Sequence, residues 1–260
     1  MMQSQERKSS IITMLILGVA LAGNAFMALT WVLDQSRPDD FAERVRMALL
    51  ERPAMLGEAM RVLQAQQAQE EQRRVEAQRE AVRAERQALF ADPSDPVRGN
   101  PSGDVTIVEF LDARCQFCRR LHGEMQALIE SDRNVRVVVK DLPVLGPPSV
   151  LAARALLAAH RQGAHARMLD ALMRMEEEIN EQSLQSQAIR LGLDWDLLQR
   201  DMRDQTIMDR LGRNMDLARR LSITGTPALV VADHVFVGFF DRRSLQDLVT
   251  FARSRSDQTN

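Results

Sequence analysis

Tyrosine is absent from this 260-residue chain, and all aromatic residues together make up only 4% of it. Such scarcity argues against base-stacking surfaces and against aromatic platforms for sugars. The formal net charge of −2 gives no reason to expect nucleic acid or another strongly charged partner. Hydrophobic residues still make up 45% of the chain, so a sizeable core can form. These absences leave a globular protein whose partners are neither nucleic acids nor sugars.

Cysteine is equally scarce, because the chain has only Cys115 and Cys118, with two residues between them. The pair stands where the apolar, β-branched run 105–111, typical of a buried strand, gives way to helical spacing. Cys115 is therefore expected near a helix N-terminus, where unpaired backbone N–H groups and the helix dipole favour a thiolate. Three cations flank the pair and should add to this effect: Arg114, Arg119 and Arg120. The combination predicts a reactive cysteine.

A structural disulfide or half of a zinc site is the alternative explanation of the pair. A disulfide that closes so short a loop removes little entropy from the unfolded chain. A tetrahedral zinc site needs two more ligands at suitable spacing. The histidines are scattered singly, which is typical of surface or packing residues: His122, His160, His165 and His234. The sequence therefore favours a redox-active C-x-x-C pair and predicts neither a metal nor another cofactor.

The N-terminal part carries an export signal. Residues 11–33 are mostly apolar and follow Arg7 and Lys8. About 20 apolar residues suffice to span a bilayer, and the two cations would hold the N-terminus in the cytoplasm. We expect residues 1–34 to be a retained inner-membrane anchor, with a signal peptide cleaved near Ala22 as the alternative. A retained anchor and a cleaved signal peptide would both deliver the rest of the chain to the oxidising periplasm. There, two cysteines in a single C-x-x-C pair suit disulfide exchange.

Residues 35–91 are predicted to form a helical stalk. Two amphipathic helices meet near Pro53, and a soluble Gln/Glu/Arg/Ala stretch follows at 64–88. Their apolar faces are Phe41, Val45 and Leu49, then Leu56, Met60 and Leu63. We expect residues 41–63 to mediate self-association, since these faces have no evident partner in the rest of the chain.

Further along the stalk, apolar positions recur every seven residues, at Ala68, Val75, Val82 and Leu89. The spacing predicts a thin coiled-coil seam. A solvated spacer helix is the equal alternative, because the alanines on this stretch bury little area.

Residues 92–260 form the predicted catalytic domain. Strands at 105–111 and 135–139 enclose the cysteine helix as a βαβ unit, and a wholly helical block follows at 147–221. We expect roughly four helices there, with breaks at Gly163, Gly192, Gly212 and 181–183. A strand after Pro227, a turn, a second strand and a closing helix at about 242–252 complete the domain.

This order of elements resembles the DsbA-like branch of the thioredoxin superfamily over about residues 104–252. The motifs that carry the resemblance are Val108-Glu-Phe-Leu-Asp112, Asp141-Leu-Pro-Val-Leu-Gly146 and Gly225-Thr-Pro227. The N-terminal helices and linker are more similar to suppressor-of-copper-sensitivity C and related DsbA-like proteins. The resemblance implies an α/β, thioredoxin-like fold with an inserted helical domain and thiol:disulfide oxidoreductase activity. Gln116-Phe117 replaces the Pro-His of strongly oxidising DsbA, which leaves the redox potential open.

The resemblance also implies roles for individual residues. Pro227 corresponds to the family's cis-proline, which would place the Thr226 backbone beside the cysteines for strand-like pairing with a substrate chain. Glu109, a carboxylate within an apolar strand, corresponds to an acid that would shuttle a proton to and from Cys118; a structural glutamate is the alternative. Cys115 would be the nucleophile and Cys118 the resolving cysteine.

We therefore interpret the chain as a periplasmic thiol:disulfide oxidoreductase, either an oxidase or an isomerase. Its expected partners are exported proteins with thiols or disulfides, a membrane redox protein that resets the pair, and further copies of the chain. Two alternatives stay open. One is a non-enzymatic oligomeric scaffold or holdase with an inert disulfide. The other is a thiol copper-binding protein, although no Met or His stands near the cysteines at metal-ligand spacing.

Overall fold

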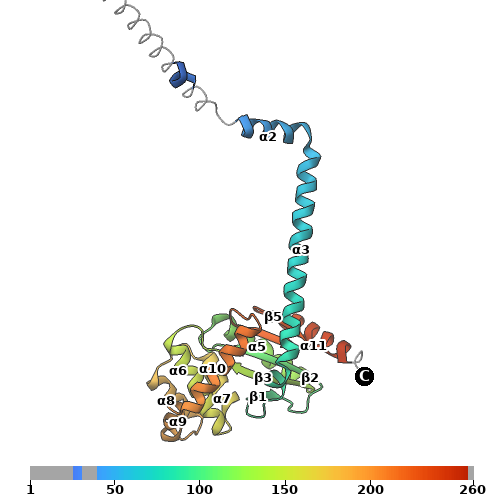
Figure 1. Cartoon of the computed structure of the whole chain (residues 1–260). Coiled ribbons are helices and arrows are strands. Elements are labelled where there is room, and N and C mark those ends of the chain that lie inside the picture. Colours follow the sequence, from blue (N-terminus) through green and yellow to red (C-terminus); the bar gives the residue numbers. More distant parts are fainter. Residues whose placement is uncertain (1–25, 31–39, 257–260) are drawn as a thin grey trace, which may run out of the picture. The chain divides into compact units, whose positions relative to one another are not determined.

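The computed structural model describes residues 26–30 and 40–256 (Figure 1). The chain divides into two compact units, one that ends at Glu70 and one that begins at Glu71. Most of the predicted anchor or signal peptide, residues 1–34, lies outside the described residues. Within the described ranges, no helix has both the length and the apolar character needed to cross a membrane.

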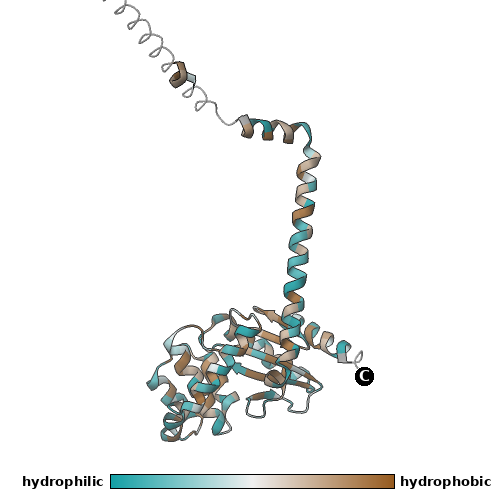
Figure 2. Ribbon diagram, viewed as in Figure 1, coloured by the Kyte–Doolittle hydropathy of each residue, from teal (hydrophilic) through white to brown (hydrophobic). Residues whose placement is uncertain are grey.

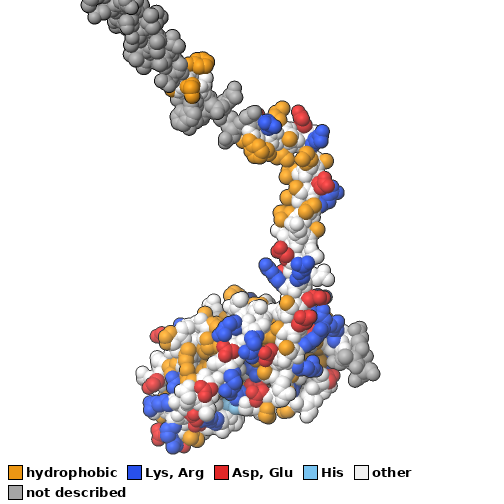
Figure 3. Space-filling view, viewed as in Figure 1, with side chains coloured by type: hydrophobic (Ala, Val, Ile, Leu, Met, Phe, Trp, Pro, Cys, Tyr) orange, Lys and Arg blue, Asp and Glu red, His pale blue; other side chains and the backbone are white. Residues whose placement is uncertain are grey.

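The first unit contains helix α2 (Asp40–Glu51) and the beginning of helix α3 (Pro53–Ala84). Proline suits the start of α3, because the first N–H groups of a helix have no partner within it. The apolar faces predicted from the sequence are exposed on these helices, as the space-filling view shows (Figure 3). Phe41 is 77% exposed, Leu56 is 56% exposed and Leu63 is 49% exposed. No described residue of this unit covers them.

The second unit is built on a five-stranded sheet with strand order β1-β3-β2-β4-β5. Its strands are β1 (Val97–Gly99), β2 (Val105–Leu111), β3 (Val135–Asp141), β4 (Ala228–Val231) and β5 (His234–Val237). Strands β2 and β3 are parallel and are joined by helix α5 (Gln116–Ser131), whereas the other pairs are antiparallel. Six of the seven β2 residues are buried, which explains the nearly continuous apolar run in the sequence. The predicted βαβ unit is confirmed.

Helices cover both faces of the sheet, whose central strands are among the most apolar parts of the ribbon (Figure 2). On one face, Ile107 packs with residues of α5 and of α11 (Arg242–Ser256). On the other, Phe110 packs with residues of α4 (Arg86–Phe90), of α10 (Gln205–Arg220) and of the end of α3. Val82 and Leu89 belong to this second cluster and are 1% and 0% exposed. The coiled-coil interpretation is wrong for these two positions, because their apolar side chains complete the core of the second unit.

The block between β3 and β4 comprises five helices in the described chain, not roughly four, and α6 to α9 gather at one end of the unit (Figure 1). They are α6 (Pro147–Arg161), α7 (His165–Arg174), α8 (Glu181–Arg190), α9 (Trp195–Met202) and α10. Gly163 and Gly192 follow helix ends with positive φ, as expected of such glycines. The break predicted at Gly212 is wrong because this residue lies inside α10. The missed break is at Asp204, whose side chain caps α10 by accepting from the N–H of Thr206.

Candidate active site

The two cysteines lie where the sheet meets the N-terminus of α5. Cys115 is the N-cap residue of this helix, and Cys118 lies in its first turn. Both are free thiols, with Cys115 7% exposed and Cys118 fully buried. The Cys115 sulfur lies 3.2 Å from the carbonyl oxygen of Thr226, and the Thr226–Pro227 peptide bond is cis. Four of the five predicted site residues therefore come together here.

The two thiols have pKa values shifted in opposite directions. The Cys118 thiol, beside the Cys115 sulfur, is the main cause that lowers the pKa of Cys115 to about 5. Thr226 and the backbone N–H groups of Phe117 and Cys118 act in the same direction, against the effect of burial. The pKa of Cys118 is raised, first by its interaction with Cys115 and then by burial. Near neutral pH the reduced site therefore holds one thiolate, on Cys115, and one thiol, on Cys118.

The three flanking arginines contribute less than the sequence suggested. Arg114 and Arg119 donate hydrogen bonds to backbone carbonyl groups. Arg120 lies over the ring of Phe239, 4.5 Å from its centroid. The lowered pKa of Cys115 comes first from Cys118, then from Thr226 and from the helix backbone.

Glu109, the fifth predicted residue, lies in β2 and is 1% exposed. Arg98 of β1, itself 5% exposed, donates to the Oε2 atom of Glu109 over 3.2 Å. Burial raises the pKa of Glu109 despite the opposing effect of this cation. The other carboxyl oxygen has no hydrogen-bond partner among the described residues. The sequence analysis missed Arg98. Its pairing with Glu109 could not be predicted from their spacing in the sequence, because β3 lies between the two strands that carry them.

A second buried pair lies on the same face of the sheet. The Nε2 atom of His165 in α7 lies 3.2 Å from Oδ2 of Asp141, at the end of β3, and both side chains are almost fully buried. In the parallel register Asp141 is opposite Leu111, two positions beyond Glu109. Asp141 raises the pKa of Glu109 and His165 lowers it, so the two pairs are electrostatically linked. The sequence had suggested only a packing role for His165.

Asp112 holds the loops beside the cysteines. The sequence analysis named it only as the last residue of a family motif and did not predict this role. Its Oδ1 accepts from the N–H of Arg114, and its Oδ2 accepts from the N–H groups of Val144 and Leu145. The carboxylate thus ties the loop before α5 to the loop after β3. Val144 and Leu145 are about half exposed, as is Phe117 between the cysteines, which gives the site an apolar rim. The sequence feature that could have predicted this role is an aspartate directly after a strand and shortly before a C-x-x-C pair.

The remaining histidines lie in ordinary packing positions. His122 is paired with Asp170, His160 lies 3.0 Å from the Ser94 carbonyl oxygen, and His234 is next to Asp233. In the part of the chain that the structure describes, no three His, Cys, Asp or Glu side chains are grouped to hold a metal ion.

The second unit has a βαβ unit with a C-x-x-C pair at the helix N-terminus, a neighbouring cis-proline and inserted helices. Together these features define a thioredoxin-like fold of the DsbA type. Residues 106–250 match the DSBA-like thioredoxin domain. The chain belongs to this family, as the resemblance implied.

Solved structures of similar proteins have the same fold. The chain is 45% identical to a thioredoxin-like oxidoreductase from Silicibacter pomeroyi DSS-3, with a TM-score of 0.63 over 65% of this chain and 98% of that one. It is 26% identical to the catalytic domain of Proteus mirabilis ScsC, with a TM-score of 0.61 over 67% and 97% of the two chains.

Among curated proteins, the Na(+)/H(+) antiporter NhaA 3 of Salinispora tropica is 32% identical over 169 residues. These residues are 63% of this chain and 26% of the antiporter. The chain thus spans about a quarter of the length of the curated relatives it matches.

Proposed function

We propose that the protein is a periplasmic thiol:disulfide oxidoreductase that exchanges disulfides with exported proteins. The observation that carries the proposal is the position of the Cys115 sulfur: it lies at the N-cap of α5, 3.2 Å from the Thr226 carbonyl oxygen, and the buried Cys118 follows in the first turn of the helix. A periplasmic location is supported by the apolar segment 11–33 and by likeness to a periplasmic thioredoxin-like protein from Salmonella enterica serovar Typhimurium. That structure is 27% identical, with a TM-score of 0.58.

In the donating direction, a substrate thiolate attacks the Cys115 sulfur of the oxidised pair. The bond between Cys115 and Cys118 breaks, and Cys118 leaves as a thiolate that takes up a proton. A second substrate thiolate then attacks the substrate sulfur of the mixed disulfide and releases the Cys115 thiolate. Two electrons pass from the substrate dithiol to the cysteine pair, and the substrate gains a disulfide.

In the accepting direction, the Cys115 thiolate attacks a substrate disulfide, and Cys118 must lose its proton to resolve the mixed disulfide. Glu109 is the proposed proton acceptor. It lies on the sheet face covered by α5 and is buried, and burial raises its pKa, which favours uptake of a proton by its carboxylate. Thr226 would pair through its backbone with the extended substrate chain.

The low pKa of Cys115 stabilises the reduced pair, which favours donation of the disulfide. An isomerase needs a substantial reduced fraction instead. Equilibration with glutathione buffers gives the redox potential, and its value relative to that of the periplasm separates the two roles. A membrane redox protein that resets the pair is the proposed second partner.

Trapping tests the proposal. Cys118→Ser should accumulate mixed disulfides with exported proteins, because the resolving thiol is gone, whereas Cys115→Ser should accumulate none. Alkylation of the reduced protein at neutral pH should modify one thiol only. Equal trapping by both variants, or none by either, would favour the scaffold with an inert disulfide.

A further inference from the structure

A polar hollow of about 480 Å³ opens beside the cysteine pair. Arg114, Gln116 and Arg119 line it on the active-site side, and Glu176, Glu177, Glu178 and Ile179 line the opposite side. Gln116 is exposed and directly follows Cys115 in the sequence, so the hollow lies beside the residue next to the reacting cysteine.

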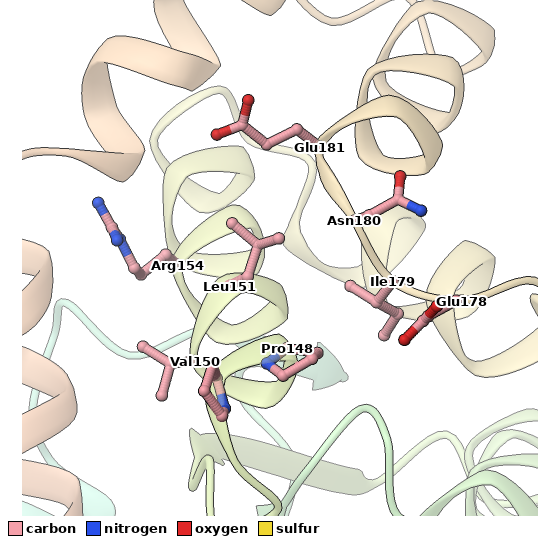
Figure 4. Close-up of a pocket in the computed structure, with 9 residues that line it drawn as sticks. Pro148, Val150, Leu151, Arg154, Glu178, Ile179, Asn180 and Glu181 are labelled. Carbon is pink, nitrogen blue, oxygen red and sulfur yellow. The ribbon is translucent and has the colours of Figure 1, made fainter.

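A second, more apolar cavity of about 840 Å³ lies next to the first. Figure 4 shows Pro148, Val150 and Leu151 of α6 across from Ile179, in the segment that precedes α8. Glu178 and Ile179 line both hollows, so the two are adjacent, and we name them together the α6–α8 groove.

The carboxylates of this groove are the groups left for a ligand. Glu176, Glu177 and Glu178 are exposed, and the structure shows no ion pair to any of them within the described residues. The arginines of the groove do not pair with these carboxylates. Arg114 and Arg119 donate hydrogen bonds to backbone carbonyl groups instead. Arg154 likewise donates to the carbonyl oxygen of Met202. The groove therefore offers unpaired negative charge beside an apolar wall.

We propose that the α6–α8 groove binds the client segment that flanks the reacting cysteine and selects segments that carry lysine or arginine. This inference rests on the proposed exchange function. Long basic side chains lay their methylene stems along apolar surface and keep their charged ends near polar groups. In the groove the stems would lie against Leu151 and Ile179, and the charged ends would reach the Glu176–Glu178 carboxylates. An acidic segment would meet like charges and be disfavoured.

The test uses the full oxidised chain and three peptides of equal length, each with one cysteine flanked by two lysines, two glutamines or two glutamates. The second-order rate of mixed-disulfide formation is divided by the rate of the same peptide with a small-molecule disulfide, since flanking charge alters the peptide thiol itself. We expect the lysine peptide to react about 10-fold faster than the glutamate peptide at low ionic strength. The ratio should shrink at high salt.

The variant Glu176→Gln/Glu177→Gln/Glu178→Gln should reduce the lysine-to-glutamate ratio to about 2 or less. A matched control, Glu71→Gln/Glu80→Gln/Asp247→Asn, removes the same charge from exposed positions outside the groove and should keep the wild-type ratio. An unchanged ratio in the groove variant, or an equal drop in the control, overturns the inference. Wild type that reacts with all three peptides alike also overturns it. No reaction even with the glutamine peptide would instead count against the proposed function.

Discussion

Cys115 and Cys118 are three positions apart in the sequence, yet their environments separate their chemistry. Cys115 sits at the helix N-cap, where the Cys118 thiol and backbone N–H groups favour its thiolate. Cys118 is fully buried and faces a neighbouring thiolate, and both effects favour its neutral form. Their positions on one helix turn therefore suit the proposed roles of nucleophile for Cys115 and resolving thiol for Cys118.

The pKa of Cys115 should be visible in both reactivity and stability. Its alkylation rate should have a midpoint near pH 5, well below the ordinary thiol value of ~8.5. Because the folded pKa is lowered, the thiolate stabilises the reduced protein fully above pH ~8.5, and this stabilisation is lost as pH falls through about 5. The reduced protein should lose denaturant resistance relative to the oxidised one over this window. An alkylation midpoint near ~8.5 would contradict the assignment of the nucleophile.

The pKa of Glu109 is shifted upward, whereas that of Cys115 is shifted downward, and the Arg98–Glu109 pair makes the upward shift testable. Arg98 lowers the pKa of Glu109, so Arg98→Gln should raise it further and shift the pH profile of disulfide exchange to higher pH. Glu109→Gln should slow exchange and remove that pH dependence. Breaking this buried ion pair should also lower the free energy of unfolding by about 3–5 kcal/mol near neutral pH. Superimposable pH profiles of all three proteins would make Glu109 a purely structural residue.

At the level of single residues, the sequence predicted what local pattern can encode. The position of the cysteines at a strand-to-helix junction follows from hydrophobic periodicity and was confirmed. Arg98 and His165 could not be placed, because each reaches its carboxylate partner from an element distant in the chain. Buried pairs of this kind depend on tertiary packing, and periodicity carries no information about them.

At the level of elements, the loops beside α5 depend on Asp112. Asp112→Ala would leave three backbone N–H groups without their acceptor, and we expect a loss of about 1–3 kcal/mol of unfolding free energy. Asp112→Asn retains only one acceptor oxygen, so its unfolding free energy should lie between those of the wild type and the alanine variant. Urea unfolding measures the loss, and limited proteolysis at Val144 and Leu145 reports whether the loop has loosened. Wild-type stability and proteolysis in the alanine variant would show that solvent replaces these bonds at no cost.

Helix boundaries show where sequence signals succeed and fail. Gly163 and Gly192 mark helix ends because the chain there adopts a positive φ that glycine tolerates best. Gly212 gives the same signal but lies within α10, since a single glycine costs a helix only about 1 kcal/mol, and tertiary packing can override that. The α9–α10 break depends on an aspartate cap, which is equally common in loops.

At the level of the whole molecule, the C-terminal part of α3 belongs to the second compact unit. Arg79 and Arg83 both pair with Asp233 in the turn between β4 and β5, and the Gln78 side chain donates to the carbonyl oxygen of Leu221. Val82 is buried in the core. A truncation that begins near Asp92 would remove these contacts, so a cut near Glu70 separates the exposed apolar helices from the catalytic unit more cleanly.

We expect the protein to self-associate through residues 41–63, and this bears on whether it acts as an isomerase. An isomerase benefits from several reduced sites around one misoxidised client, because linked sites raise the effective concentration of thiolate. The faces that include Phe41, Leu56 and Leu63 are exposed and apolar, which favours contact with further copies of the chain. We expect a chain that starts near Asp39 to be oligomeric and isomerase-competent in light scattering and refolding assays. One that starts near Glu71 should be monomeric and closer to a simple oxidase.

Point variants separate a specific interface from general loss of the stalk. Leu56→Gln/Met60→Gln/Leu63→Gln should dissociate the oligomer, because it places three polar side chains in the apolar face. Val75→Gln, at an exposed position of α3 outside residues 41–63, should not. If the chain that starts near Asp39 is monomeric at concentrations on the order of tens of micromolar, effective concentration cannot assist reshuffling, and the helices are left as a spacer.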